Sequence, residues 1–137
     1  MKPKRILHTM LRVVDLGRSV NFYTQKLGMK ELRREDYPDG KFTLSFVGFG
    51  DEAEQSVIEL TYNYGKSEYE HGNAFGHIAL EVIDIYSFCE SLKSNGVTIL
   101  REPGPMSFSA TNGACDVISF IQDPDGYKIE LIENKYL

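Results

Sequence analysis

The sequence predicts an α+β fold made from two copies of one β-α-β-β-β module. The first observation is a repeated segment: "HTMLRVVDL" at residues 8–16 aligns with "HIALEVIDI" at residues 77–85. The second is that a run with apolar residues at helical spacing follows each copy. The third is that both halves close on Ile-Glu-Leu, then two residues and Asn, in strand-like runs at 57–63 and 128–134. Matching elements in the same order indicate an internal duplication.

The first half begins with a strand at residues 8–16, because apolar and polar residues alternate there. A helix is expected over residues 17–29, and Gly28 is suited to its end, since glycine adopts the left-handed conformation that closes many helices. Strand-like runs follow, of which residues 42–50 and 57–63 are the clearest.

The second half repeats this order from residue 77. A helix is expected over residues 86–97, with Gly96 at its end. An irregular loop is expected over residues 102–115, because it contains prolines, glycines and small polar residues. The "DPDG" at residues 123–126 predicts a turn that joins the last two strands.

The length of 137 residues matches a single domain. We therefore expect one domain over residues 1–137 made of two repeats, about 5–64 and 75–134. A linker at residues 65–74 joins them, in a stretch rich in Gly and polar residues that extends to residue 76.

Two histidines and two glutamates share the sheet face opposite the covering helix in this prediction. Side chains alternate between faces along a strand, so the His8 side chain points to the opposite face of the sheet from that of the apolar Leu11. Glu59 likewise points away from its apolar neighbours Ile58 and Leu60. The same alternation in the second half puts His77 and Glu130 on the corresponding face.

A buried carboxylate is stable when it is paired or when it binds a metal ion. Two imidazoles and two carboxylates form a suitable ligand set for a divalent metal such as Zn, Ni, Co or Fe. The alternative is that each residue is an ordinary solvated strand residue, which is the commoner role of a single His or Glu. Recurrence in register in both halves favours the metal site, and the sequence pattern alone leaves both interpretations open.

Composition excludes several classes of function. With 15 basic and 20 acidic residues, the formal net charge is −5, which argues against a nucleic-acid partner. The apolar runs are too short to cross a membrane, and the N-terminus has no apolar segment typical of a secretory signal. Cys89 and Cys115 have no spacing typical of a metal site or a disulfide framework, so we expect a cytoplasmic protein.

Five segments carry a resemblance that covers nearly the whole chain: "LHTMLRV", "FYTQKLGM", "IELTYNYG", "FGHIAL" and "DPDGYKIELIE". In these segments the chain resembles glyoxalase I (lactoylglutathione lyase), a family of the vicinal-oxygen-chelate superfamily. The resemblance implies a cupped, barrel-like mixed sheet of the glyoxalase/bleomycin-resistance type and a homodimer with shared sites. Each site would take His8 and Glu59 from one chain and His77 and Glu130 from the other, with two waters completing the metal's coordination.

The resemblance also implies the reaction. The substrate is the hemithioacetal of methylglyoxal and glutathione, and the product is S-D-lactoylglutathione. The proton moves between neighbouring carbons through a cis-enediolate, with Glu130 as the main base and Glu59 as its counterpart. The compact chain is similar to members activated by nickel or cobalt, with zinc as the other choice. Arg12 and Asn63 match the residues that bind the glutamyl end of glutathione, and His77 is also expected at the substrate.

The sequence departs from the family pattern where many members hold the glycyl carboxylate. Asn73 stands before the second histidine where those members have a basic residue, and the loop at 104–116 has no Lys or Arg. The exact thiol is therefore left open. Two alternatives within the superfamily are an iron-dependent extradiol dioxygenase and a non-catalytic ligand-binding protein, and retention of all four expected ligands argues against both.

Overall fold

The structure is a computed structural model, and it describes residues 1–135. The chain divides into two compact units, Met1–His71 and a second unit that begins at Gly72. Each unit holds one of the two predicted repeats. We describe each unit separately.

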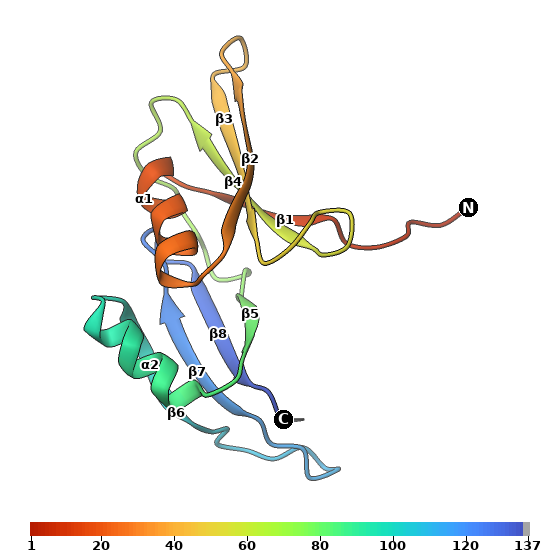
Figure 1. The fold of residues 1–137 in the computed structure, drawn as a ribbon, viewed down its shortest axis with the longest axis vertical. Coiled ribbons are helices and arrows are strands. Elements are labelled where there is room, and N and C mark those ends of the chain that lie inside the picture. Colours follow the sequence, from red (N-terminus) through yellow and green to blue (C-terminus); the bar gives the residue numbers. More distant parts are fainter. Residues whose placement is uncertain (136–137) are drawn as a thin grey trace. The chain divides into compact units, whose positions relative to one another are not determined.

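The first unit contains one helix and a four-stranded mixed sheet (Figure 1). Its elements are β1 (His8–Arg12), α1 (Leu16–Asn21), β2 (Lys30–Tyr37), β3 (Phe42–Gly48) and β4 (Val57–Asn63). The strand order is β1-β4-β3-β2. The first and last strands of the repeat, β1 and β4, pair in parallel, and the other neighbours are antiparallel.

The second unit repeats this arrangement strand for strand. Its elements are β5 (His77–Val82), α2 (Ile85–Ser94), β6 (Thr98–Pro105), β7 (Val117–Gln122) and β8 (Lys128–Glu133). The order is β5-β8-β7-β6, again with a parallel pair between the first and last strands. The predicted fold class, two β-α-β-β-β modules with mixed sheets, is confirmed.

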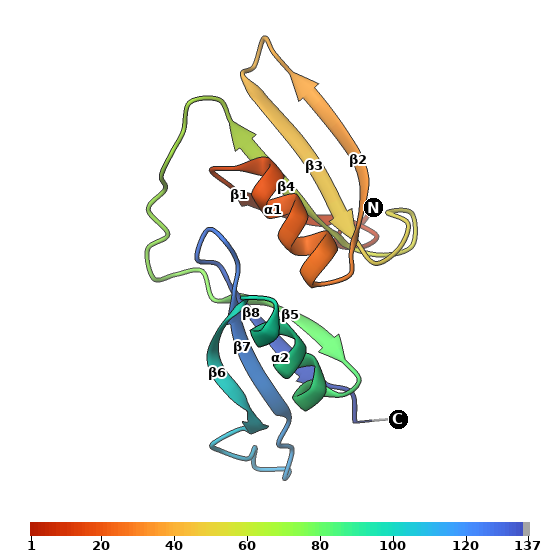
Figure 2. The same cartoon turned by 60° about the vertical axis from the view of Figure 1, so that its left-hand side comes forward.

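Both helices begin at an aspartate that stands at the same place in each repeat. The Asp15 side chain accepts a hydrogen bond from the Arg18 N–H at 3.0 Å, and Asp84 accepts one from the Ser87 N–H at 3.1 Å. Such caps satisfy backbone donors that the first turn leaves free. Each helix covers one face of its own sheet (Figure 2), where α1 packs on β3 and β4, and α2 on β6, β7 and β8.

The helix ends match the predicted glycines. Gly28 and Gly96 both have a φ of +80°, a conformation that glycine adopts without strain. The first helix does not continue as an α-helix over the whole predicted range. It changes at Phe22 into a π-helical turn, Phe22–Lys26, in which the Leu27 N–H donates to the Phe22 carbonyl.

The core of each unit lies between the helix and the covered face of the sheet. Leu11 and Leu60 in the first unit, and Ile129 and Leu131 in the second, are buried as the alternation predicts. Within residues 1–135, the buried apolar residues are Leu11, Val13, Leu16, Phe22, Tyr23, Leu27, Met29, Phe46, Val47, Val57, Ile58, Leu60, Ile85, Cys89, Leu92, Val97, Ile118, Ile121, Ile129 and Leu131. Not all of them face the helix, because Phe46 lies across from Glu59 on the other face of the sheet. The opposite face of each sheet carries the histidines and glutamates.

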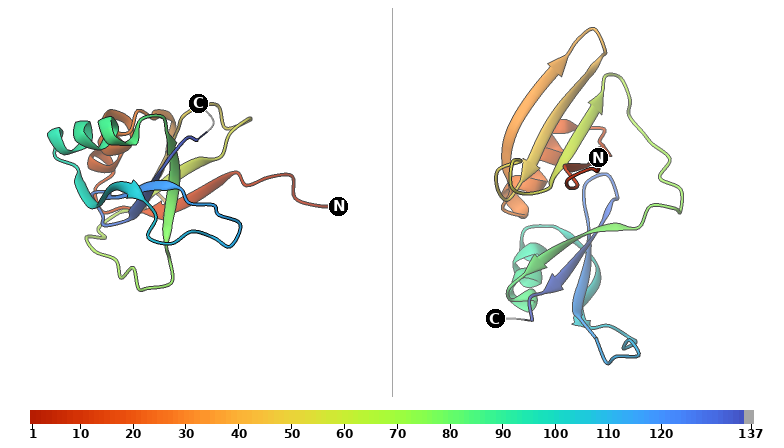
Figure 3. Two further views of the ribbon diagram at one scale, coloured as in Figure 1. Left: turned by 90° about the horizontal axis from the view of Figure 1, so that it is seen from below. Right: turned by 90° about the vertical axis from the view of Figure 1, so that its right-hand side faces the viewer.

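The irregular loop in the second unit is shorter than predicted. Strand β6 extends to Pro105, so residues 102–105 are strand and the loop starts after them. The loop then leads to β7 beyond the ends of both strands (Figure 3), and the Met106 N–H donates to the Asp116 carbonyl at its base. The turn at residues 123–126 is confirmed, with the buried Asp123 accepting from the Asp125 and Tyr127 N–H groups at 2.9 Å.

Candidate functional site

In the first unit, His8 and Glu59 form a direct pair on the sheet face opposite α1. The His8 Nε2 lies 2.6 Å from the Glu59 Oε2. The Glu59 side chain is only 14% exposed and that of His8 is 35% exposed, so the carboxylate is sheltered while the imidazole reaches solvent. The parallel pairing of β1 with β4 brings them together, because His8 is in register with Val57, two residues before Glu59.

The second unit contains the equivalent pair, His77 and Glu130. The His77 Nε2 lies 3.5 Å from the Glu130 Oε1, and the side chains are 38% and 15% exposed. The register is the same, since His77 pairs with Lys128, two residues before Glu130. The structure thus places all four residues on the predicted faces and joins them as two pairs, one in each unit.

A phenylalanine stands beside each pair. Phe46 is directly across from Glu59 on the antiparallel strand β3, and its ring meets the His8 ring edge to face, with centroids 5.6 Å apart. Phe120 is across from Glu130 in the same way and meets the His77 ring at 5.2 Å. Both ring pairs have an interplanar angle of 77°, a favourable arrangement for aromatic rings.

In both units an arginine lies across from the phenylalanine on the next strand, and sequence reasoning missed it. Arg33 on β2 is in register with Phe46, and Arg101 on β6 is in register with Phe120. Each arginine directly follows a β-bulge, which inserts a residue and redirects the strand. A signal was present: Leu-Arg occurs at residues 32–33 and again at residues 100–101, after the helix of each repeat.

The two arginines have different partners. The Arg33 guanidinium carbon lies 3.6 Å from the centroid of the Phe46 ring, and its nitrogens donate to the Glu52 carboxylate at 2.8 and 3.1 Å and to Glu35. The hydrogen bond from Arg33 holds the pKa of the Glu52 carboxyl below its usual value. Arg101 instead donates to backbone carbonyls, at 2.9 Å to Gly104 and Ile118 and at 2.7 Å to Pro105.

Arg12 and Asn63 lie on neighbouring strands of the first sheet, on the face that carries His8. Arg12 is in register with Thr61, two residues before Asn63. The Asn63 side-chain amide donates to the Tyr69 hydroxyl at 3.0 Å. The two predicted substrate-binding residues therefore share the face of the His8–Glu59 pair, at the opposite end of β1 from His8.

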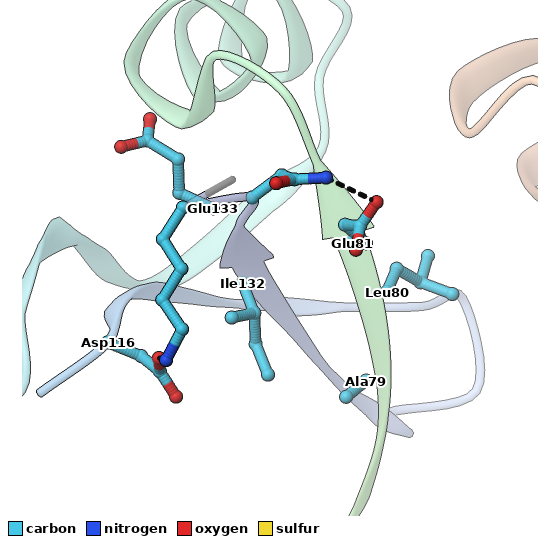
Figure 4. Close-up of a pocket in the computed structure, with 8 residues that line it drawn as sticks. Ala79, Leu80, Glu81, Asp116, Ile132 and Glu133 are labelled. Carbon is cyan, nitrogen blue, oxygen red and sulfur yellow. Dashed lines mark hydrogen bonds and ion pairs between the residues drawn. The ribbon is translucent and has the colours of Figure 1, made fainter. Parts of the chain in front are cut away.

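The second unit keeps the asparagine but replaces the arginine at the places equivalent to Arg12 and Asn63. These places are occupied by Glu81 and Asn134, and the Asn134 amide donates to the Glu81 carboxylate at 2.9 Å. Both line a pocket at the end of β5 and β8 (Figure 4). Lys135 also lines it and forms an ion pair with Asp116 at 3.2 Å. The duplication therefore preserves the His–Glu pair but not the arginine that could bind an anion.

Each pair offers one imidazole nitrogen and one carboxylate oxygen, which are suitable donors for a divalent transition metal. Within residues 1–135, no group of three or more His, Cys, Asp or Glu side chains is placed to hold a metal ion. Each unit by itself thus presents one imidazole and one carboxylate side by side. No helix in this described part of the chain is long and apolar enough to span a membrane.

Comparison with known families gives a match over most of the chain. Residues 5–131 match the family model described as Glyoxalase/Bleomycin resistance protein/Dioxygenase superfamily. A probable lactoylglutathione lyase from Synechocystis is 56% identical, over 93% of this chain and 94% of that protein. A lactoylglutathione lyase from Neisseria meningitidis is 55% identical, over 96% of this chain and 91% of that protein.

Solved structures give the same grouping. The glyoxalase I of Leishmania major, described as trypanothione-dependent, is 44% identical with a TM-score of 0.82, over 97% of this chain and 88% of that one. Glyoxalase I from Zea mays is 48% identical with a TM-score of 0.85 over 95% of this chain. This chain spans only 44% of the length of the maize protein.

Proposed function

Since the chain belongs to the glyoxalase/bleomycin resistance protein/dioxygenase superfamily and groups there with lactoylglutathione lyases, we propose that it is a metal-dependent glyoxalase I. It would isomerise the hemithioacetal of methylglyoxal and glutathione to S-D-lactoylglutathione, and so detoxify methylglyoxal in the cytoplasm. The observation that carries the proposal is the duplicated His–Glu pair, on equivalent strands and in the same register in both units.

The proposed ligands of one divalent ion are His8, Glu59, His77 and Glu130. Each pair offers donors of the right type, and each glutamate is sheltered enough that its charge needs a partner. We propose a homodimer in which one chain supplies the pair of the first repeat and the other chain that of the second. Nickel or cobalt is the favoured ion and zinc the alternative, in keeping with the compact chain.

The proposed chemistry is a proton transfer between adjacent carbons. The bound ion would supply Lewis-acid stabilisation of the negative charge that develops on the substrate oxygens. The Glu130 carboxylate takes the proton from the carbon that bears sulfur and returns it to the neighbouring carbon, as a general base and then a general acid. Glu59 occupies the equivalent position in the other repeat and is the second candidate for this role.

Substrate binding is assigned to Arg12 and Asn63, with His77 also at the substrate. A guanidinium binds a carboxylate through two parallel hydrogen bonds, which suits Arg12 to the glutamyl end of glutathione. The glycyl end has no basic residue in the usual places, at position 73 or in the loop at 104–116. The thiol is therefore proposed to be glutathione or a related thiol that needs no clamp at that end.

The decisive test is turnover by metal-free protein after addition of Ni²⁺, Co²⁺ or Zn²⁺. The assay follows the ultraviolet absorbance of the thioester formed from a preformed hemithioacetal. We expect no turnover without metal and full turnover with one of the three ions. Metal binding without turnover would favour a non-catalytic ligand-binding protein, and consumption of oxygen with a catechol and iron would favour the dioxygenase alternative.

The shared site has a separate test by subunit complementation. Inactive His8→Ala and His77→Ala chains are mixed under conditions that exchange subunits. If each site takes ligands from both chains, one of the two sites in the mixed dimer keeps all four ligands and activity returns. Absence of activity despite demonstrated exchange would contradict the shared site. Full activity of the wild-type chain as a monomer at high dilution would also contradict it, because all four ligands would then come from one chain.

A further inference from the structure

A row of four side chains crosses the first sheet on the face that carries the His8–Glu59 pair. In spatial order they are His8 on β1, Glu59 on β4, Phe46 on β3 and Arg33 on β2. Each strand of the sheet contributes one member, so the row runs from the edge strand that holds the histidine to the opposite edge.

Contacts link every member of the row. The His8 Nε2 lies 2.6 Å from Glu59, the rings of His8 and Phe46 are 5.6 Å apart, and the Arg33 guanidinium carbon is 3.6 Å from the centre of the Phe46 ring. Phe46 is only 3% exposed, so its ring is fixed by packing. At the far end Arg33 is itself held, because it donates two hydrogen bonds to Glu52.

The second repeat shows that the arginine is not placed on the ring by the fold alone. Arg101 stands at the same register position, across from Phe120, but its guanidinium donates to the carbonyls of Gly104, Ile118 and Pro105. The separation between histidine and glutamate is also longer there, 3.5 Å against 2.6 Å. The same duplicated residue therefore closes an irregular strand in one repeat and covers an aromatic ring in the other.

We propose that Arg33 is a positioning residue for the His8 ligand, acting through the Phe46 ring that it covers. This inference rests on the proposed function, because it takes His8 as a metal ligand. The Arg33 guanidinium lies over the Phe46 ring, Phe46 fixes the orientation of the imidazole, and the imidazole then presents Nε2 beside the Glu59 carboxylate. Glu52 and Glu35 keep the guanidinium in place and offset its charge near a cation site.

The sign of the change in metal affinity on removal of Arg33 distinguishes a positioning role from a purely electrostatic one. Arg33 is a positive charge on the same face as the proposed metal, so its removal should tighten metal binding if only charge matters. Loss of a residue that orients a ligand has the opposite sign, and loss of such supporting contacts typically weakens metal binding by about 10–100-fold. We expect the lower end, about tenfold, because Arg33 acts through one intervening ring.

Arg33→Met is the test variant, and Arg34→Met is its matched control. Arg34 is the next residue on the same strand, equally exposed, and paired with Glu31 at 2.8 Å, so its removal deletes the same charge without touching Phe46. Two quantities are measured in the full-length protein: the Ni²⁺ dissociation constant, and the nuclear Overhauser contact between the His8 and Phe46 rings in the metal-free protein.

We expect Arg33→Met to weaken Ni²⁺ binding about tenfold and to reduce the His8–Phe46 ring contact, while Arg34→Met changes neither. Unchanged or tighter Ni²⁺ binding in Arg33→Met, or an unchanged ring contact, overturns the proposal. Should that variant be insoluble, Arg33→Gln removes the same cation and carries the same expectation. A third variant, His8→Ala, tests the proposed metal site separately from the role of Arg33. If His8→Ala retains Ni²⁺, the proposed metal site is wrong. The role of Arg33 is then still tested by the His8–Phe46 ring contact, compared between the metal-free wild-type protein and metal-free Arg33→Met.

Discussion

Replacing Arg101 with Met is expected to destabilise the second unit strongly. The Arg101 Nη1 donates to the carbonyls of Gly104 and Ile118, both at 2.9 Å and both partly buried, and Nη2 donates to the Pro105 carbonyl at 2.7 Å. These bonds close strand β6 where its register against β7 shifts between Arg101 and Gly104. Methionine has a similar length and no donor, so it removes the bonds while filling much of the space.

The size of the effect follows from the state of the three carbonyls. A hydrogen bond from a charged donor contributes about 1.5–3 kcal/mol, and a partly buried acceptor left without a donor loses most of that. Water can replace the guanidinium at the exposed Pro105 carbonyl. Two lost bonds that share one nitrogen are not additive, so we expect the free energy of unfolding to fall by about 2–4 kcal/mol. The melting temperature should then fall by roughly 6–12 °C for a chain of this size.

The assay is urea unfolding at equilibrium, with Arg34→Met as the control. Arg34 pairs with Glu31 on the surface, where such a pair contributes only about 0.2–1 kcal/mol. A difference of at least about 1 kcal/mol between the two variants is expected. If Arg101→Met is as stable as Arg34→Met, the hydrogen bonds from Arg101 to the backbone do not stabilise this part of the sheet. The assignment of a structural role to Arg101 and a different role to Arg33 then fails.

The remaining predictions concern the proposed metal site, the loop at 104–116 and the two cysteines. His77→Ala should lose bound metal and turnover while keeping its far-ultraviolet circular dichroism, and full activity in this variant would remove His77 from the proposed site. The loop at 104–116 is either a lid over the proposed site or a tolerated surface insertion. If it is a lid, trimming residues 107–113 to a short glycine-containing turn should lower kcat and raise KM together, with metal affinity unchanged because no proposed ligand lies in the loop. Unchanged kinetics would identify a surface insertion. The exposed Cys115 should react with iodoacetamide in the folded protein, and the buried Cys89 only after unfolding. Burial raises the pKa of the Cys89 thiol and so leaves less thiolate at a given pH. Equal labelling of both cysteines in the folded protein would contradict the burial of Cys89.

The sheet face that carries the two histidines and two glutamates was predictable, because two simple regularities place these residues. Alternation along a strand decides the face of His8 and Glu59, and the duplication repeats the decision for His77 and Glu130. The parallel register that joins each pair needs the three-dimensional structure, since nothing local to β1 specifies which residue of β4 it meets.

The arginines could not be assigned to this face from alternation. A bulge between Glu31 and Arg33, and another between Ile99 and Arg101, each add one residue to the strand. One extra residue moves every later side chain to the opposite face, so a strict two-residue period puts both arginines on the wrong side. The repeated Leu-Arg dipeptide is the clue that a longer alignment of the two halves would have used.

The length of β6 was also beyond the sequence pattern. Residues 102–105 contain Pro and Gly, which normally predict a loop. The strand continues there because the Arg101 side chain binds the carbonyls of Gly104 and Pro105, and a side chain that folds back along its own strand leaves no periodic signal.

The parallel pairing of first and last strands has a consequence for folding. In each repeat the histidine comes from the strand made first and the glutamate from the strand made last, and His8 meets Val57 as His77 meets Lys128. Contacts between residues distant in sequence form late, because closing a long segment of chain costs entropy before any contact compensates for it. A repeat that lacks its final strand therefore has no His–Glu pair at all. At the proposed site, metal binding would then report completed folding, since a nascent or truncated repeat is unable to present both proposed ligands.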